Sequence, residues 1–183
     1  KNILNIGVFI VIMQSAGWLV RNQEHFEFTG EYFFIMISSL VGMDYMISSG
    51  DFLMLFIGLE LATIPIAALV AADTMKTKSS EAGVKLILNA ALSSGILLFG
   101  ISMLYGTTGS VYFSEISRAF EKSGLEILAF IFIFTGIAFK ISIVPFHLWT
   151  ADVYEGAPVN ITSYLSVISN ASSVFILLIL LFT

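Results

Sequence analysis

Six long apolar stretches dominate this chain of 183 residues and restrict it to one class of fold. The hydrocarbon core of a bilayer is about 30 Å thick, and a helix of about 20 mostly apolar residues spans it. The stretches are apolar on nearly all sides, as helices in lipid must be, whereas helices of soluble proteins keep one polar face. We therefore predict an all-α integral membrane protein with about six transmembrane helices, at residues 3–20, 32–49, 52–72, 84–106, 126–149 and 159–182.

The composition argues against several other classes of protein. Charged residues make up 11% of the chain, compared with about 25% in soluble domains. The net charge is −5 and the sequence has no basic run, so we expect the lipid bilayer as its surroundings and no nucleic acid as a partner. Cysteine is absent, which excludes a disulfide framework, thiolate-bound zinc or iron–sulfur clusters, and a thiol nucleophile on this chain.

Short connections between the apolar stretches favour an antiparallel bundle. We divide the chain into two N-terminal helices within residues 1–49 and a four-helix core within residues 50–183. The basic residues of the connections are distributed evenly between the two sides, so charge does not decide the orientation in the membrane. The chain begins at Lys1 without an initiator methionine and stops directly after an apolar run, so we expect it to be a segment of a longer protein.

Glu60 is an acidic residue near the middle of the stretch 52–72. Its position nine residues into the stretch places it about 13 Å deep at 1.5 Å per residue. A charge at the centre of a transmembrane helix costs about 2.5–3.5 kcal/mol on insertion scales, so its presence requires a reason. One interpretation is a neutral carboxyl that is hydrogen-bonded to a neighbouring helix. The other, which we favour, is a carboxylate that exchanges a proton or pairs with a lysine.

Lys140 is the stronger candidate, because it lies too deep in the stretch 126–149 to reach either membrane surface comfortably. A buried lysine changes its proton affinity readily with its surroundings, so it can load and release a proton. Pro145 cannot donate to the carbonyl of Ile141, and we expect it to kink or break the helix beside Lys140 and to free carbonyls that hold water. His147 falls on nearly the same helical face as Lys140, either as a further proton carrier or as a membrane-surface residue beside Trp149.

Two further groups of polar residues lie in apolar stretches. Lys85 opens the stretch 84–106 and is followed by Asn89 and Ser93 at intervals of four residues. A lysine in this position often extends to the membrane surface, but Glu60 could reach it as an ion-pair partner. The last stretch carries small polar side chains that either hold helices together or line a water path. They are Thr162, Ser163, Ser166, Ser169, Asn170 and Ser173.

The sequence from 138 to 158, AFKISIVPFHLWTADVYEGAP, resembles the subunit N family of proton-translocating NADH:quinone oxidoreductases, the antiporter-like membrane subunits of respiratory complex I. The segments FIGLEL at 56–61, EAGVK at 81–85 and LLFGISMLYG at 97–106 resemble the same family. The related subunits L and M share the lysine and the Pro-Phe-His sequence, but DVYEGAP at 152–158 favours N. The resemblance extends over residues 50–170 and is weaker in the first two stretches.

This resemblance implies a specific architecture and site. Members of the family have about fourteen transmembrane helices, with two inverted five-helix repeats that each form a half-channel. The chain would hold the third to eighth helices and most of one repeat. The glutamate of the family's fifth helix corresponds to Glu60, the lysine of its sixth to Lys85, and the lysine of its broken seventh helix to Lys140. The segments 73–83 and 149–158 would face the cytoplasm.

One position departs from the family pattern. Relatives often carry a further lysine in the eighth helix where this chain has Asn170. Asparagine orients water but does not bind and release a proton at physiological pH. The resemblance therefore supports Glu60, Lys85 and Lys140 more firmly than it supports a complete proton relay, in which water or another residue would have to replace the missing lysine.

The expected function is that of a proton-translocating, multi-pass subunit of the bacterial inner membrane. NADH, flavin and iron–sulfur clusters would be bound by partner membrane and peripheral subunits, quinone would be the substrate of the complex, and this chain itself would hold no cofactor and perform no redox chemistry. One alternative is a cation/proton antiporter or membrane-bound hydrogenase subunit with the same half-channel, which sodium-dependent transport without NADH oxidation would favour. Another is a structural scaffold whose buried charges only determine helix packing.

Overall fold

The computed structural model describes residues 1–21, 29–121 and 123–182, and these residues form helices joined by short connections. The long helices are α1 (Asn2–Arg21), α2 (Thr29–Ser48), α3 (Phe52–Val70), α4 (Thr77–Thr108) and α6 (Gly124–Lys140). The short helices are α5 (Phe113–Ala119) and α7 (Leu148–Gly156). The final apolar stretch contains α8 (Val159–Ser163), the π-helix η2 (Tyr164–Ser169) and α9 (Asn170–Phe182). The predicted all-α fold is confirmed.

Within the described residues, four helical segments are long and apolar enough to cross a membrane: α1, α3, α4 and the continuous segment Val159–Phe182. The other two expected spans, 32–49 and 126–149, correspond to α2 and α6. Of these two helices, the first is less apolar than the four segments above, and the second is too short. α2 has 20 residues, but Glu31, Asp44 and several hydroxyl side chains reduce its hydropathy. α6 has 17 residues, because the helix ends at Lys140.

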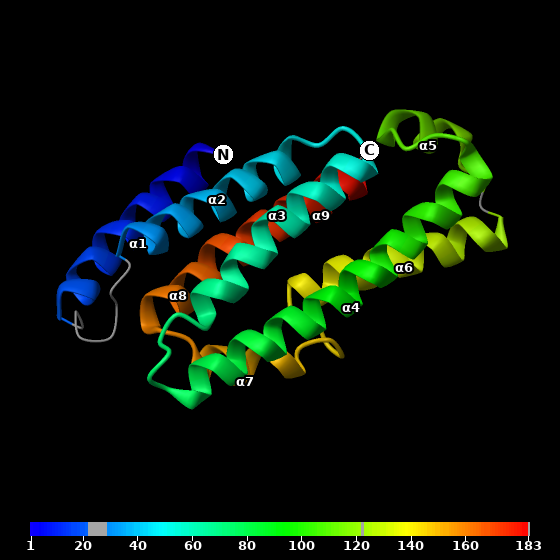
Figure 1. The fold of residues 1–183 in the computed structure, drawn as a ribbon. Helices are drawn as coiled ribbons and strands as arrows, with labels where there is room; N and C mark the ends of the chain where they lie inside the picture. The colour runs from blue at the N-terminus through cyan, green and yellow to red at the C-terminus, as the bar shows by residue number, and fades with distance from the viewer. Residues whose placement is uncertain (22–28, 122, 183) are drawn as a thin grey trace.

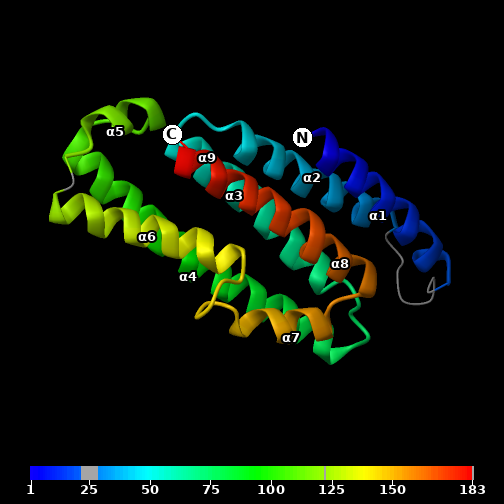
Figure 2. The ribbon, with the colours of Figure 1, turned by 180° about the vertical axis from the view of Figure 1, so that it is seen from behind.

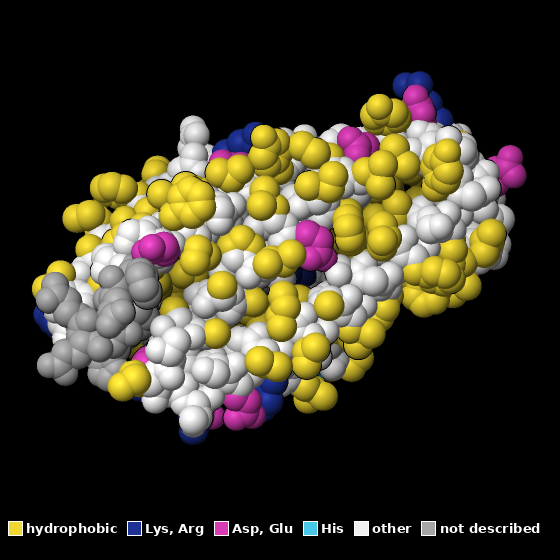
Figure 3. Space-filling view, viewed as in Figure 1, with side chains coloured by type: hydrophobic (Ala, Val, Ile, Leu, Met, Phe, Trp, Pro, Cys, Tyr) yellow, Lys and Arg dark blue, Asp and Glu magenta, His cyan; other side chains and the backbone are white. Residues whose placement is uncertain are grey.

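The helices form an elongated bundle of three adjacent layers (Figures 1 and 2). α1 and α2 form one side, α3 and α9 lie in the middle, and α4 and α6 form the other side. α5 lies across one end of the bundle, whereas α7 lies at the opposite end beside the start of α4. Hydrophobic side chains cover much of the face shown in Figure 3, and charged side chains lie mostly toward its margins. This distribution is the one expected of a protein surrounded by lipid.

Side chains close to the helix ends satisfy backbone groups that the helices leave free. The carboxylate of Asp51 accepts from the Met54 N–H at 2.7 Å at the start of α3. At the start of α6, Ser123 and Glu126 form a reciprocal capping box. Glu126 is 4% exposed, and its carboxylate accepts from the Ser123 N–H at 2.9 Å. This buried acid therefore has a local structural role, because helix ends without partners are costly in lipid.

Glycines allow neighbouring helices to approach one another closely. A Cβ atom added to Gly58 of α3 would lie 2.5 Å from the Met46 nitrogen of α2. A Cβ atom added to Gly100 of α4 would lie 2.8 Å from the Ala129 oxygen and 2.9 Å from the Ile133 nitrogen of α6. Membrane helices associate largely through such close packing, since lipid provides little hydrophobic driving force between helices. These contacts hold the pairs α2–α3 and α4–α6 together.

The predicted helix at 126–149 is wrong in its second half. α6 ends at Lys140, residues 141–147 are not helical, and α7 begins at Leu148. Pro145 lacks an N–H donor and its ring crowds the preceding turn, which agrees with the expected break. The break is longer than a kink, because the chain turns directly after Lys140 and the N–H of Ile143 donates to the Ala138 oxygen at 2.9 Å. Ser142 has a φ of 62°, which reverses the local chain direction.

The predicted start of the fourth span, at residue 84, is also too late. α4 begins at Thr77, so Lys85 lies in its third turn and not at its first residue. The polar residues of this first part suggested a loop. They form a helix because one face packs on α3 and α7, where Ser79 is fully buried and donates to the Val70 oxygen at 2.6 Å.

Replacing Gly100 with alanine should destabilise the protein by about 1–3 kcal/mol, because the new methyl group would overlap backbone atoms of α6. Gly95→Ala is the matched control, since an added Cβ there meets no atom within 4 Å. Thermal unfolding of the purified full-length protein in detergent would compare the two variants. Equal stability of both variants would contradict the proposed close contact between α4 and α6.

Candidate functional site

Lys140 is the last residue of α6, at the point where the helix breaks inside the bundle. A helix C-terminus carries partial negative charge from its free carbonyl groups, so it stabilises a cation there. The Lys140 ammonium group donates a hydrogen bond to the Thr63 hydroxyl of α3 at 2.6 Å. Thr63 is 2% exposed. The break thus presents a lysine to the buried face of a neighbouring helix.

Glu60 and Lys140 lie at the same depth in the bundle, as the glycine contacts of α4 indicate. Gly83 of α4 packs against Ala67 and Ala71 of α3, and Gly136 of α6 packs against Ser93 and Leu97 of α4. Counting residues along these antiparallel helices places both Glu60 and Lys140 level with residues 90–93 of α4. The side chains of Glu60 and Lys140 form no direct ion pair within 4.0 Å among the described residues.

Glu60 is half-buried, and no hydrogen bond or ion pair of its carboxylate is found in the described part of the chain. It lies on the side of α3 that carries Thr63, three residues farther along the same helix. Residues three apart are neighbours on a helix surface. Its carboxylate therefore remains available to respond to the charge of Lys140.

Lys85 does not pair with Glu60 in this structure, which corrects the expected contact. Its ammonium group lies 2.7 Å from Glu81 of α4 and 2.7 Å from Asp152 of α7. Lys85 is about six residues along α4 from the level of Glu60, a separation of about 9 Å at 1.5 Å per residue. The sequence predicted neither carboxylate partner. Glu81 was recognisable in principle from its i,i+4 spacing, but Asp152 required the tertiary structure.

The helix break opens a cavity of about 400 Å³ on the side of Lys85. Lys85, Asn89, Pro145 and Asp152 line it together with aromatic side chains. Polar groups of the break are largely satisfied within the protein: the Trp149 indole donates to the Phe139 oxygen at 3.3 Å, and Thr150 donates to the Ser142 hydroxyl at 2.6 Å. Irregular backbone at membrane depth is tolerated where protein buries it or where it borders a wet cavity. Here the protein supplies hydrogen-bond partners, and charged and amide side chains line the adjacent cavity.

A second, much smaller cavity of about 10 Å³ lies directly against Lys140. Its polar lining comprises Thr63, Ser93, Lys140, Ser169 and Asn170. A volume of about 10–15 Å³ with several polar partners is the minimum that accommodates one water molecule.

The stacked rings of Phe139 and Trp149, with centroids 5.5 Å apart, line both cavities. They therefore lie between the wide cavity and the surroundings of Lys140.

The small polar side chains of the last apolar stretch do not all lie on one face of the helix. Ser166 is exposed and donates to the Ser163 oxygen at 3.3 Å, whereas Ser169 is buried beside Asn170. The reason is η2: a π-helix turns less per residue than an α-helix, so it changes which side chains share a face. Asn170 donates to the Tyr154 hydroxyl of α7 at 3.4 Å. Asn89 instead donates to the Lys85 oxygen at 2.9 Å within α4.

His147 does not share a helical face with Lys140, because the break separates the two residues. It is exposed at the first position before α7, where its side chain makes no capping hydrogen bond. No group of three or more His, Cys, Asp or Glu side chains with metal-binding geometry occurs in the described ranges. The structure thus joins Lys140 to Thr63 at the level of Glu60, and separately joins Lys85 to Glu81 and Asp152.

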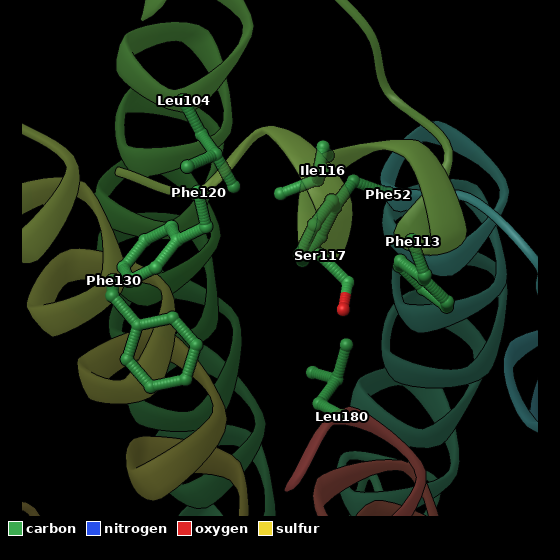
Figure 4. Close-up of a pocket in the computed structure, with 8 residues that line it drawn as sticks. All are labelled: Phe52, Leu104, Phe113, Ile116, Ser117, Phe120, Phe130 and Leu180. Carbon is green, nitrogen blue, oxygen red and sulfur yellow. The ribbon is translucent and has the colours of Figure 1, made fainter. Parts of the chain in front are cut away.

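The apolar pocket in Figure 4 lies at the end of the bundle nearest α5 and is separate from these residues. It has a volume of about 180 Å³. Its lining consists of Phe52, Leu104, Phe113, Ile116, Ser117, Phe120, Phe130 and Leu180. None of these side chains titrates near neutral pH, so the pocket lacks groups for proton transfer.

Comparisons with known proteins agree with this arrangement of helices. Residues 49–183 match the family model described as NADH:quinone oxidoreductase/Mrp antiporter, TM. NADH-quinone oxidoreductase subunit N of Phocaeicola vulgatus is 51% identical over 181 residues, which cover 99% of this chain and 38% of the relative. Subunit N of Azobacteroides pseudotrichonymphae is 50% identical over 182 residues, with 100% and 38% coverage. The chain spans about two fifths of the length of these relatives.

Solved structures show the same fold. Respiratory complex I from Thermus thermophilus with bound Aureothin contains a chain with a TM-score of 0.75 and 29% identity, over 81% of this chain and 33% of that one. An archaeal membrane-bound sulfane sulfur reductase contains one with a TM-score of 0.72 and 25% identity, over 77% and 29%. Bacterial relatives and apolar helices together indicate a bacterial membrane protein. The expected similarity to subunit N is confirmed, and the chain belongs to the NADH:quinone oxidoreductase/Mrp antiporter transmembrane family.

Proposed function

We propose that this chain is the proton-translocating part of a membrane subunit of an NADH:quinone oxidoreductase, and that Lys140 binds and releases the transferred proton. The observation that carries the proposal is the position of Lys140 at a helix break inside the bundle, hydrogen-bonded to Thr63 and level with Glu60. Its relatives are named as subunits of that enzyme. A charged side chain at this depth is energetically costly. A lysine that alternates between its charged and neutral states to transfer protons would explain why the cost is tolerated.

The proposed mechanism is electrostatic and involves two arrangements of charge. In the arrangement observed here, Glu81 and Asp152 hold Lys85, and Glu60 is left without an ion-pair partner among the described residues. We propose that its carboxylate then stabilises the charged form of Lys140. In a second arrangement, Lys85 moves toward Glu60 and partly neutralises it. Lys140 then loses a stabilising negative charge, and its proton is released. Changes elsewhere in the complex would select between these arrangements by moving α7.

We assign the route of water near Lys140 to the two cavities. The wide cavity beside Lys85 and Asn89 would connect the site to the side of the membrane on which α7 lies. The small cavity beside Asn170 has room for one water molecule on the other side of the Phe139–Trp149 ring pair. We assign proton exchange to water in these cavities, with Asn170 orienting that water and Lys140 as the titrating group.

Redox chemistry would occur on other subunits of the complex. The absence of cysteine removes the thiolate ligands that iron–sulfur clusters require. NADH, flavin and clusters are therefore assigned to partner subunits, and quinone to the complex as a whole. The exposed apolar side chains of this chain would contact lipid and the neighbouring membrane subunits.

Replacing Lys140 with methionine should abolish or greatly reduce proton pumping through this subunit, because methionine keeps most of the length of the side chain but cannot carry a proton. The variant would be introduced into the full-length subunit, and NADH-driven acidification would be measured in sealed membrane vesicles. Lys78→Met is the control, since Lys78 is exposed and pairs with Glu155 at the end of the bundle. Undiminished pumping per electron in the Lys140 variant would refute the proposed role.

Glu60→Gln distinguishes this proposal from a structural scaffold. Glutamine keeps the shape of the side chain but removes its negative charge, so pumping should decrease while the amount of assembled complex stays near normal. A scaffold role makes the opposite prediction: less assembled complex, with normal pumping by the complex that remains. Complex content on native gels and pumping per complex would be measured in the same membranes.

The stability of the protein should depend little on the loss of either carboxylate partner of Lys85 alone. Asp152→Asn leaves Glu81 in place, and Glu81→Gln leaves Asp152, so each should lower the stability only slightly, as is typical of exposed ion pairs. The double variant leaves Lys85 without either partner and should be destabilised by more than the sum of the two. Thermal unfolding of the full-length protein would measure the difference, with Glu155→Gln as the control. If the two single variants together lowered the stability as much as the double variant does, the idea that Glu81 and Asp152 substitute for each other as partners of Lys85 would be wrong.

A further inference from the structure

We propose that Thr63 is a positioning residue for Lys140, whose hydroxyl holds the lysine amino group beside Glu60; this inference rests on the proposed role of Lys140. The Lys140 amino group donates to the Thr63 hydroxyl oxygen at 2.6 Å across the contact between α6 and α3. Thr63 is almost fully buried. It is a neutral side chain in direct contact with the lysine, and the sequence-based site did not include it.

The hydroxyl proton of Thr63 is already used within α3. It is donated to the Leu59 oxygen at 2.6 Å. A hydroxyl has one proton to donate and lone pairs that accept, so in this arrangement the Thr63 oxygen faces Lys140 as an acceptor. The intrahelical bond therefore fixes the direction in which the acceptor points, and that direction determines where the amino group lies.

An acceptor of this kind suits a lysine that must both bind and release a proton. An ammonium group and a neutral amine both carry N–H donors, so the bond to Thr63 can persist in either state. A carboxylate at the same point would favour the charged state strongly and retain the proton. Thr63 thus orients Lys140 without retaining its proton, whereas Glu60, three residues away on the same helix, supplies the charge that influences it.

The position of the small cavity supports the same role. Thr63 and Lys140 both line the cavity of about 10 Å³, together with Ser93, Ser169 and Asn170. An amino group anchored to Thr63 is held at the edge of this space, within the part of the bundle where one water molecule fits. Without the anchor, the flexible lysine side chain is free to adopt several other rotamers.

Thr135 of α6 provides a matched control for the chemistry of Thr63. Its hydroxyl donates to the Ile131 oxygen at 2.8 Å, which is the same bond to the residue four positions earlier. This position lies toward the surface of the described bundle, away from the contact between Lys140 and α3. Replacing either threonine with valine removes a hydrogen bond from its hydroxyl to a backbone oxygen of its own helix. Only the Thr63 replacement also removes the contact with Lys140.

The test compares Thr63→Val, Thr63→Ser and Thr135→Val in the full-length subunit within the assembled complex. In sealed membrane vesicles, Thr63→Val should lower NADH-driven proton pumping about tenfold, because a lysine without its hydrogen bond occupies the position for proton exchange less often. Thr63→Ser keeps the hydroxyl and should restore pumping close to wild type, and Thr135→Val should leave it unchanged. NADH oxidation with an artificial electron acceptor and native gels would measure complex content.

Combining Thr63→Val with Lys140→Met separates positioning from packing. If Thr63 acts through Lys140, the valine change should have no additional effect on pumping once the lysine is absent. Wild-type pumping by Thr63→Val, or a serine variant as impaired as the valine variant, would overturn the inference while leaving the role of Lys140 intact. Normal pumping by Lys140→Met would instead refute the proposed function. If the valine variant assembles poorly, Thr63→Ala against Thr63→Ser gives the same comparison, and equal pumping by these two overturns the inference.

Discussion

The end of α6 at Lys140 is the structural constraint on which the rest of the site depends. A continuous helix would carry Lys140 past α3 with its backbone fully bonded and without a favourable helix end nearby. The break creates a helix C-terminus at Lys140, where the partial negative charge of the helix end favours a cation, and residues of the non-helical segment 141–147 border a cavity. It also directs α7 toward the start of α4, where Asp152 reaches Lys85. A single interruption therefore places one lysine and provides a partner for another.

The close packing of α4 explains how these groups are held at the right depths. Gly83, Gly100 and Gly156 lie at its contacts with α3, α6 and α7, respectively, where a larger residue would overlap neighbouring atoms. Each contact fixes the register of one helix pair. Because the rise per residue is constant, these three registers place Glu60 level with Lys140. They also place Lys85 nearer the start of α4 than either of these residues. The separation of the two lysines is thus a consequence of packing between helices.

Much of the fold and part of the site could be predicted from local patterns. The apolar stretches correspond to the long helices, because a helix in lipid needs length and apolarity, and both are visible in a single segment. The depth of Lys140 and the break near Pro145 follow from the same kind of local reasoning. The first turns of α4 were missed because their polar residues suggest a loop, and only contacts with α3 and α7 explain their helical state. The exposed position of Ser166 was missed because the sequence carries no local signal for η2.

By itself, the sequence determined that the chain is a helical membrane protein, which residues carry charge inside it and, through the segment 138–158, which family it resembles. Only the tertiary structure decided which of these residues meet. Lys85 contacts Glu81 and Asp152 in place of Glu60, Lys140 contacts Thr63, and His147 lies apart from both. The physical reason is that burial depth depends on position within one helix, whereas contact depends on the rotation and register of two helices. Those are set by glycine contacts, a helix break and a π-helix that act across the whole bundle.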